Sequence, residues 1–314
     1  VAALGVIVPF VGGYLFCIFI GFGTIESLFV GAAMVATSVG ITARVIKDMG
    51  VTQAKESRVI IGAAVIDDVL GMIILGIVVG IAGGSGSNLT NTVIIAIEAI
   101  LFVIGIMFLG NYLGKYVAKK NTQTNICVPK NSNNHTLKIS ALSIALILCF
   151  GLSYLASVLQ LAAIVGAFLA GMLFAEFRDK YFCHDQMEAI NEFLVPFFFI
   201  FVGISVDVSE FGSVIWIAII LTIIAIVTKF LGCGFGAIKM GRSSAMIVGS
   251  GMFPRGEVAL IVAAIGLSYG VVTSSVFNIV VFMAIATTLA SPPMLSYFFK
   301  KKYGEGQKMV KKIG

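Results

Sequence analysis

Charge is what this sequence has least of. Asp, Glu, Lys and Arg make up only 11% of its 314 residues, hydrophobic residues make up 59%, and the mean hydropathy is +1.07. A soluble domain of this size would need far more charge, so the composition excludes an ordinary globular protein. It predicts instead an all-α polytopic membrane protein, whose backbone polar groups are satisfied within helices that cross the lipid bilayer.

Cysteine and histidine are also scarce. The five cysteines form no CxxC motif, and the two histidines, His135 and His184, lie in separate loops between apolar runs. This pattern argues against a zinc site and against a disulfide framework. We therefore expect no cofactor, and only transported ions as ligands.

The start of the chain lacks an initiating Met, a basic segment and a small-residue cleavage site. These are the marks of a signal peptide, so none is expected. Because the chain begins inside an apolar run at Val1, we expect its natural N-terminus to lie upstream.

Apolar runs of about twenty residues are long enough to cross a bilayer as helices, and the sequence contains about ten of them. They cover residues 1–20, 27–46, 58–82, 90–117, 137–158, 160–177, 193–206, 213–238, 244–268 and 273–299. The seventh run is short and contains Pro196, and the fifth and sixth are barely separated.

The distribution of basic residues orients these helices. All but two of the 21 Lys and Arg residues fall in alternate loops and in the tail at residues 300–314. By the positive-inside rule these loops and the tail are cytoplasmic, which fits an even number of spans in a cell (inner) membrane. The net charge of +6 is thus dispersed over loops, so we expect no nucleic acid among the partners.

Two adjacent aspartates, Asp67 and Asp68, lie in the middle of the third apolar run. An ionisable residue near the bilayer centre costs roughly 2.5–3.5 kcal/mol on insertion scales, so it normally faces protein or water and marks an ion pathway. Adjacent positions on a helix point about 100° apart, so the two carboxylates cannot face the same partner. They are expected to titrate as a coupled pair. A carboxylate that holds either a proton or a small monovalent cation can perform exchange.

The two basic residues outside the loops are Lys229 and Arg255, which lie inside the eighth and ninth apolar runs together with Glu257. With the two aspartates they form a set of two cations and three anions within the membrane. Buried charges of this kind are tolerated when they are paired or solvated.

Small polar residues interrupt two of the apolar runs at corresponding places. The second run contains Thr37 and Ser38, and the ninth contains Pro254 and Gly256, which should break the helix. Each run is the middle member of a three-span group, and the two groups are inverted relative to each other. Broken helices in inverted halves are typical of transporter binding sites, although Gly, Ser and Thr also serve ordinary helix packing.

Residues 36–39, the Asp67-Asp68 pair, Lys229 and residues 254–259 together carry a family resemblance. On these motifs the sequence resembles the cation:proton antiporters of the NapA and Kef branch over essentially its whole length. Members of that family have about thirteen spans, so the resemblance implies that about three more precede Val1.

The resemblance implies an NhaA/NapA-like inverted-repeat fold with two broken helices that cross. Residues 1–82 and 213–299 would form its core domain as two inverted three-helix groups. A linker helix would cover residues 83–117, and helices of the dimer and scaffold domain would cover residues 118–212. Residues 300–314 would form a basic cytoplasmic tail, and the protein would be a homodimer.

The resemblance also implies a role for each ionisable residue. Asp68 would be the main ion-binding carboxylate, while Asp67 would pair with Lys229. Glu257 and Arg255 would lie in or below the second helix crossing. The implied sodium ligands are oxygens of Asp68, Asp67, Thr37 and Ser38.

These features predict a secondary transporter, not an enzyme, that exchanges Na+ or Li+ for protons by alternating access. The alternative within this class is K+/H+ exchange of the Kef type. Kef systems usually carry Gln or another neutral residue at the position of Asp67, whereas an Asp-Asp pair is typical of electrogenic sodium/proton exchangers.

Two alternatives come from other classes. An intramembrane aspartyl protease also needs two carboxylates, but they must share a proton across facing helices, which neighbours on one helix cannot do. A regulatory membrane scaffold would carry no ion flux, so a transport assay separates it from an exchanger.

Overall fold

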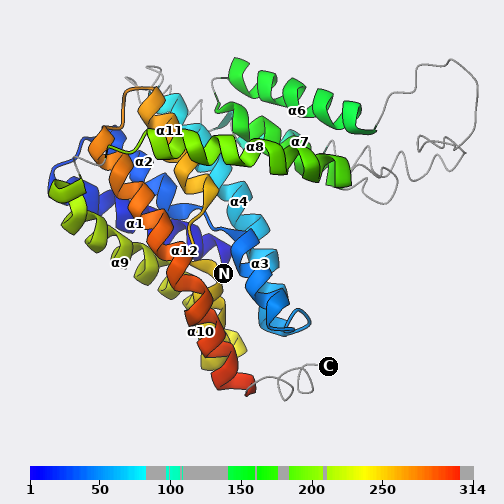
Figure 1. Cartoon of the computed structure of the whole chain (residues 1–314), viewed down its shortest axis with the longest axis vertical. Helices are drawn as coiled ribbons and strands as arrows, with labels where there is room; N and C mark the ends of the chain where they lie inside the picture. The colour runs from blue at the N-terminus through cyan, green and yellow to red at the C-terminus, as the bar shows by residue number, and fades with distance from the viewer. Residues whose placement is uncertain are drawn as a thin grey trace, which may run out of the picture. The chain divides into compact units, whose positions relative to one another are not determined.

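The computed structural model describes most of the chain. The described residues are 1–82, 97–98, 100–106, 108, 141–159, 161–175, 184–207 and 211–304. Within these ranges every regular element is a helix (Figure 1), which confirms the all-α prediction.

The chain divides into two compact units, which we describe separately. The first unit comprises Val1–Val78 and Ile204–Gly314, and the second comprises Val79–Gly203. The helices of the first unit are α1 (Ala2–Ile20), α2 (Thr24–Val35), α3 (Val39–Asp48), most of α4 (Lys55–Ala82), α9 (Phe211–Gly236), the short 3-10 helix η3 (Ile238–Met240), α10 (Arg242–Met252), α11 (Glu257–Ser268) and α12 (Ser274–Tyr303). Those of the second unit are α6 (Ala141–Val158), α7 (Ala163–Ala175) and α8 (His184–Ile204).

Six segments of the described chain are long and apolar enough to cross a membrane, and α10 with α11 makes a seventh if this bent pair counts as one span. The protein is therefore a multi-pass membrane protein. The segments are α1, α2 with α3, α4, α8, α9 and α12. Helices α6 and α7 are apolar but shorter. The predicted fourth span, residues 90–117, lies mostly outside the described residues.

Close helix packing holds the first unit together. Helix α1 packs against α2 and α9, and α9 also packs against α10 and α12. Glycines make this approach possible: a Cβ atom at Gly232 would lie 2.6 Å from the carbonyl oxygen of Leu4, and one at Gly13 would lie 2.3 Å from Sδ of Met34. Small residues serve this purpose between membrane helices because they let two backbones come close.

The predicted interruption of two helices is confirmed. Helix α2 ends at Val35 and α3 begins at Val39, while α10 ends at Met252 and α11 begins at Glu257 with a bend of 44°. Pro254 has no N–H to continue α10, so it favours a break there. Both breaks lie in the first unit.

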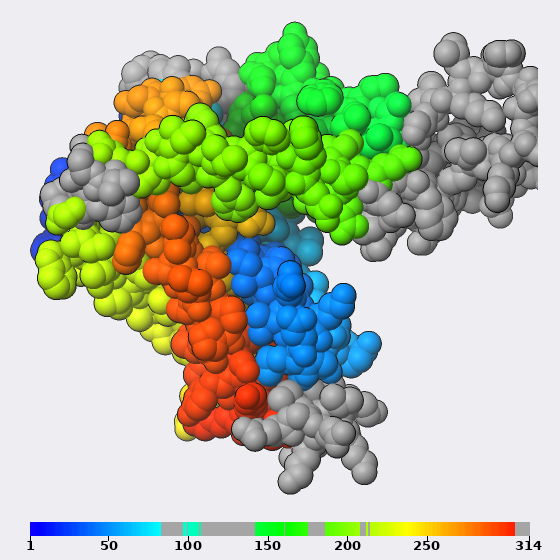
Figure 2. All heavy atoms as spheres, in the orientation of Figure 1, coloured from blue at the N-terminus to red at the C-terminus, as the bar shows by residue number. Residues whose placement is uncertain are grey.

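Helices α8 and α12 extend beyond their predicted spans. The seventh span was expected at 193–206, but α8 begins at His184 and continues through Pro196, because its polar first turns extend beyond the apolar run. The basic tail was expected from residue 300, but α12 continues to Tyr303. Figure 2 shows α12, in orange and red, running beside the blue α3, with which it is in contact.

Candidate functional site

A buried ion pair joins α4 to α9. Nζ of Lys229 lies 2.8 Å from Oδ1 and 2.9 Å from Oδ2 of Asp67, and both side chains are fully buried. Removing one partner of such a pair leaves an uncompensated buried charge, which destabilises proteins by about 3–5 kcal/mol. The two residues therefore hold each other in place.

Two cations lie at the C-terminal end of α2, where the first break begins. Nζ of Lys229 donates a hydrogen bond to the carbonyl oxygen of Val35 at 2.6 Å. Nη1 of Arg255 donates to the carbonyl oxygens of Ala36 at 2.8 Å and of Val35 at 3.3 Å. The last carbonyls of a helix lack partners within the helix and carry its negative dipole end, so both cations are well placed to stabilise this terminus.

Hydroxyl groups connect the first break to α4 and α10. Oγ1 of Thr37 lies 2.7 Å from Oδ2 of Asp67 and 3.1 Å from the carbonyl oxygen of Met252. Since a hydroxyl has one proton, it can donate to only one of these oxygens at a time. Oγ1 of Thr42 donates to the carbonyl oxygen of Gly251 at 2.8 Å. Hydroxyl groups of the first broken helix are thus placed to donate hydrogen bonds to the C-terminal carbonyl oxygens of α10.

The two breaks also contact each other directly. The backbone N–H of Ser38 donates to the carbonyl oxygen of Pro254 at 2.8 Å, and Oγ of Ser38 lies 3.4 Å from Oε2 of Glu257. Glu257 is in the first turn of α11, where the helix dipole favours a negative charge. A Cβ at Gly256 would lie 2.6 Å from Oγ of Ser38, so this approach requires glycine.

Arg255 is fully buried, and its backbone is held by α12. Its N–H donates to Oγ1 of Thr287 at 3.1 Å, and the hydroxyl of Thr288 donates to its carbonyl oxygen. Nε and Nη2 of the guanidinium have no hydrogen-bond partner among the described residues. An unmet buried donor costs about 1–3 kcal/mol, and both of these donors lie beside the two breaks.

Asp68 differs from its neighbour. Its side chain is half-buried, and it makes no hydrogen bond or ion pair with any residue that the structure describes. The 100° turn between adjacent positions on α4 directs it away from the contacts of Asp67. One carboxylate of the pair is therefore engaged in the protein, and the other is available to a ligand.

The structure places the predicted site residues as follows. Six of them lie at the two breaks: Asp67 bonds to Lys229 and Thr37, Arg255 shares the carbonyl oxygen of Val35 with Lys229, and Ser38 pairs with Glu257. Asp68 lies next to these residues on α4 but makes no hydrogen bond with Thr37 or Ser38. A sodium ion coordinated jointly by Asp68 and these hydroxyls therefore stays a prediction.

A second polar cluster was missed by the sequence analysis. Glu56 is only 1% exposed; its Oε1 accepts from Ser244 at 2.8 Å and from Lys302, and its Oε2 accepts from Tyr303 at 2.8 Å. This cluster joins the start of α4 to the start of α10 and the end of α12. In the sequence Glu56 lies two residues before Arg58, at the edge of an apolar run. A charged residue at such a position is normally interpreted as part of a loop.

The family comparison agrees with this geometry. Residues 1–301 match the sequence model of the family described as sodium/hydrogen exchanger, transmembrane.

Named relatives cover nearly all of the chain. It is 36% identical over 305 residues to the Na(+)/H(+)-K(+) antiporter GerN of Bacillus cereus, covering 96% of this chain and 75% of the relative. It is 31% identical over 306 residues to a Na(+)/H(+) antiporter of Enterococcus hirae, covering 96% and 77%. It is 33% identical over 309 residues to the high-affinity Na(+)/H(+) antiporter NhaS3 of Synechocystis sp., covering 96% and 64%. The chain therefore belongs to the family of transmembrane sodium/hydrogen exchangers.

Proposed function

We propose that this protein exchanges Na+ or Li+ for protons across a membrane by alternating access. One observation carries the proposal: of two adjacent carboxylates within a membrane helix, Asp67 is locked to Lys229, and Asp68 has no protein partner among the described residues. Ionisable residues at membrane depth mark ion pathways. Membership of the exchanger family makes the protein a transporter, not an enzyme.

Asp68 acts as the shared carrier in this proposal. When it is ionised it binds a monovalent cation, and when it is protonated it releases that cation. Because a proton and a cation cannot occupy the same carboxylate oxygens, binding of one ion at one membrane face drives release of the other. Exchange then follows when the carboxylate faces the two sides of the membrane in turn.

Asp67 and Lys229 add a second step. A cation that arrives near Asp68 competes with the ammonium for the oxygens of Asp67, and the displaced Lys229 can give up a proton. More protons than cations then move in each cycle. Such an electrogenic cycle gains about 2.3 kcal/mol for each net charge moved through 100 mV of membrane potential.

The two helix breaks supply the remaining ligands. Hard monovalent cations prefer oxygen ligands, and the breaks offer the hydroxyls of Thr37 and Ser38 with nearby backbone carbonyls. Reaching them requires Thr37 to leave Asp67, so we expect the hydrogen bonds described above to rearrange when the cation binds. Broken helices of other transporters place carbonyls and half-helix dipoles at ion sites in this way.

The architecture that fits this cycle is an inverted repeat of about ten spans in this chain, with residues 1–82 and 213–299 as a core that moves against a scaffold at 118–212. The presence of both broken helices in the first unit, hydrogen-bonded to each other, supports this arrangement. The linker at 83–117, the homodimer, the cell membrane location and the cytoplasmic tail are further parts of the proposal.

A second candidate is exchange of K+ for protons, because the GerN relative is named for both Na+ and K+. The charged Asp67, which is bound to Lys229, favours exchange of sodium over exchange of potassium, since Kef systems usually have a neutral residue at this position. Comparing proton flux driven by Na+, Li+ and K+ gradients of equal size decides between them.

The decisive experiment is transport in proteoliposomes with a pH-sensitive dye inside. An imposed Na+ gradient should move protons through the wild-type protein, and Asp68→Asn should abolish this movement. Asp48→Asn is the matched control, because Asp48 is exposed at the end of α3 and away from the breaks. Full Na+-driven flux in Asp68→Asn overturns the assignment, and no flux in the wild type favours a non-transporting scaffold.

A further inference from the structure

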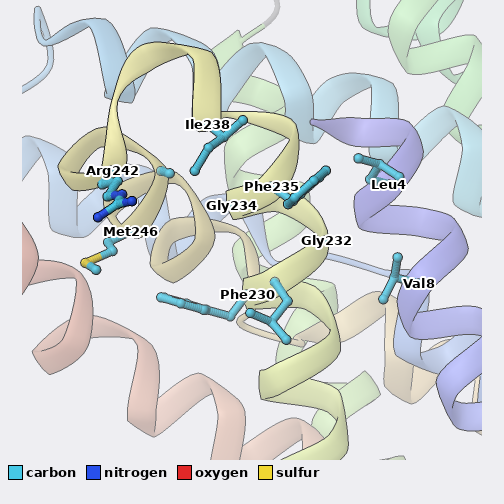
Figure 3. Close-up of a pocket in the computed structure, with 11 residues that line it drawn as sticks. Leu4, Val8, Phe230, Gly232, Gly234, Phe235, Ile238, Arg242 and Met246 are labelled. Carbon is cyan, nitrogen blue, oxygen red and sulfur yellow. The ribbon is translucent and has the colours of Figure 1, made fainter.

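An open apolar groove lies in the first unit between α1, α9 and α10. Its volume is about 520 Å³, within the range of about 300–1,000 Å³ that small-molecule sites occupy. In Figure 3 the side chains of Leu4 and Val8 lie on the side of α1, and those of Phe230 and Met246 lie across from them. The groove is separate from the two helix breaks, so the proposed ion exchange does not account for it.

Close backbone packing forms the groove. Gly232 and Gly234 line it from α9. A Cβ at Gly232 would lie 2.6 Å from the carbonyl oxygen of Leu4, and one at Gly234 would lie 3.3 Å from that of Ala245. These close approaches fix how α9 packs against α1 and α10, and the larger side chains on either side of the glycines form the walls of the groove. The groove is thus fixed by the helix packing.

The groove opens onto the outer surface of the helices. The exposed fraction is 73% for Phe235 and 58% for Leu231, and both residues line the groove. Helices α1 and α9 are long and apolar enough to span the membrane, so the apolar side chains exposed on them lie at membrane depth. An apolar hollow on such a surface is best filled by a hydrocarbon chain, because water there would lose hydrogen bonds.

Cations lie at one end of the groove. Arg242, the first residue of α10, lines it beside Met246, across from Leu4 and Val8 (Figure 3). Lys239 in η3 does not line the groove but directly follows Ile238, which does, and both basic residues are exposed without a hydrogen bond or ion pair among the described residues. The N-cap of α10 makes no side-chain hydrogen bond, so backbone N–H groups there add further donors for an anion.

We propose that this groove binds an anionic phospholipid of the leaflet that the basic loops face. One acyl chain lies against the apolar walls, and the phosphate group lies at Arg242 and Lys239. Charge complementarity selects this occupant, since a neutral apolar ligand would leave both cations unmatched. Each basic residue near an anionic lipid headgroup contributes roughly fivefold to binding.

A tryptophan reporter measures the lipid in the groove. The chain has a single tryptophan, Trp216, which is replaced by Phe, and Phe235→Trp then places the reporter in the groove. The protein is reconstituted in phosphatidylcholine vesicles that contain a small fraction of brominated lipid, which quenches tryptophan on contact. Brominated phosphatidylglycerol is compared with brominated phosphatidylcholine at equal mole fraction.

We expect brominated phosphatidylglycerol to quench this reporter with several-fold higher apparent affinity than brominated phosphatidylcholine. Arg242→Gln should lower that preference roughly fivefold. Arg44→Gln is the matched control, because Arg44 is an exposed arginine on α3 that does not line the groove. Ile7→Trp is the reporter control on α1; it is 56% exposed outside the groove and should show no headgroup preference.

Three results would overturn the proposal. Equal quenching by the two lipids at Phe235→Trp means that ordinary boundary lipid fills the groove. A preference that survives Arg242→Gln together with Lys239→Gln means that the groove does not select the headgroup. Absence of quenching by either lipid means that protein, such as a second copy of the chain, covers it. Transport activity plays no part in this test, so its outcome is independent of the ion-exchange proposal.

Discussion

Asp67→Asn tests how far the buried ion pair holds the site together. The substitution keeps the size of the side chain but removes its charge, so Lys229 loses its ion-pair partner and keeps the hydrogen bond to the carbonyl oxygen of Val35. Both members of the pair are fully buried. An uncompensated buried charge costs about 3–5 kcal/mol, and we expect the free energy of unfolding to fall by that amount.

The same reasoning predicts a rescue. Lys229→Gln alone leaves Asp67 as the uncompensated charge, while the double variant with Asp67→Asn leaves none. We expect the double variant to recover about 1–3 kcal/mol relative to the sum of the two single losses, as residues in direct contact do.

Unfolding of the purified protein in detergent, followed by heat or by denaturant, measures these differences. Asp48→Asn serves as the control, since an exposed carboxylate without a special role should change stability by less than about 0.5 kcal/mol. The reasoning is refuted if the losses of the two single variants simply add in the double variant. It is also refuted if Asp67→Asn is as stable as the control.

Three further predictions concern packing, the polar cluster around Glu56 and ion choice. Gly256→Ala should destabilise the protein by about 1–3 kcal/mol, because its Cβ would lie 2.6 Å from Oγ of Ser38. Gly40→Ala is the control, since a Cβ there meets open space. Equal melting temperatures of the two variants would contradict the prediction. Glu56→Gln should weaken the contact with Lys302 at the end of α12 and lower the free energy of unfolding by about 1–3 kcal/mol. Protease should then cleave the C-terminal end faster, and unchanged cleavage argues against this prediction. Proton flux should be faster with Na+ or Li+ gradients than with K+, and a K+ rate equal to the Na+ rate favours the Kef-type alternative.

Much of the site could be predicted because polar groups are conspicuous within apolar runs. Lys229, Arg255 and the aspartate pair stand out because each is costly in lipid without a partner or a function. Pro254 marks the second break for a chemical reason, the missing N–H. The helices themselves follow from run length, since a bilayer fixes how long an apolar helix must be.

Other features could not be predicted from the residues alone. Helix geometry predicts that the two aspartates face different ways but not which of them meets Lys229. The family resemblance implied Asp67, and the structure shows that pair. Thr287 and Thr288 support the second break from α12, yet hydroxyls in a helix often bond to their own backbone and so carry an ambiguous signal. The Glu56 cluster depends on a contact between distant parts of the chain.

The central claim is that a proton and a cation compete for Asp68. Purified protein in weakly buffered detergent solution should release protons when NaCl is added, and not when choline chloride is added. Asp48→Asn should behave like the wild type, and Asp68→Asn should release none from this site and lose most of the pH change. If Asp68→Asn releases as many protons on sodium addition as the wild-type protein does, the account is contradicted.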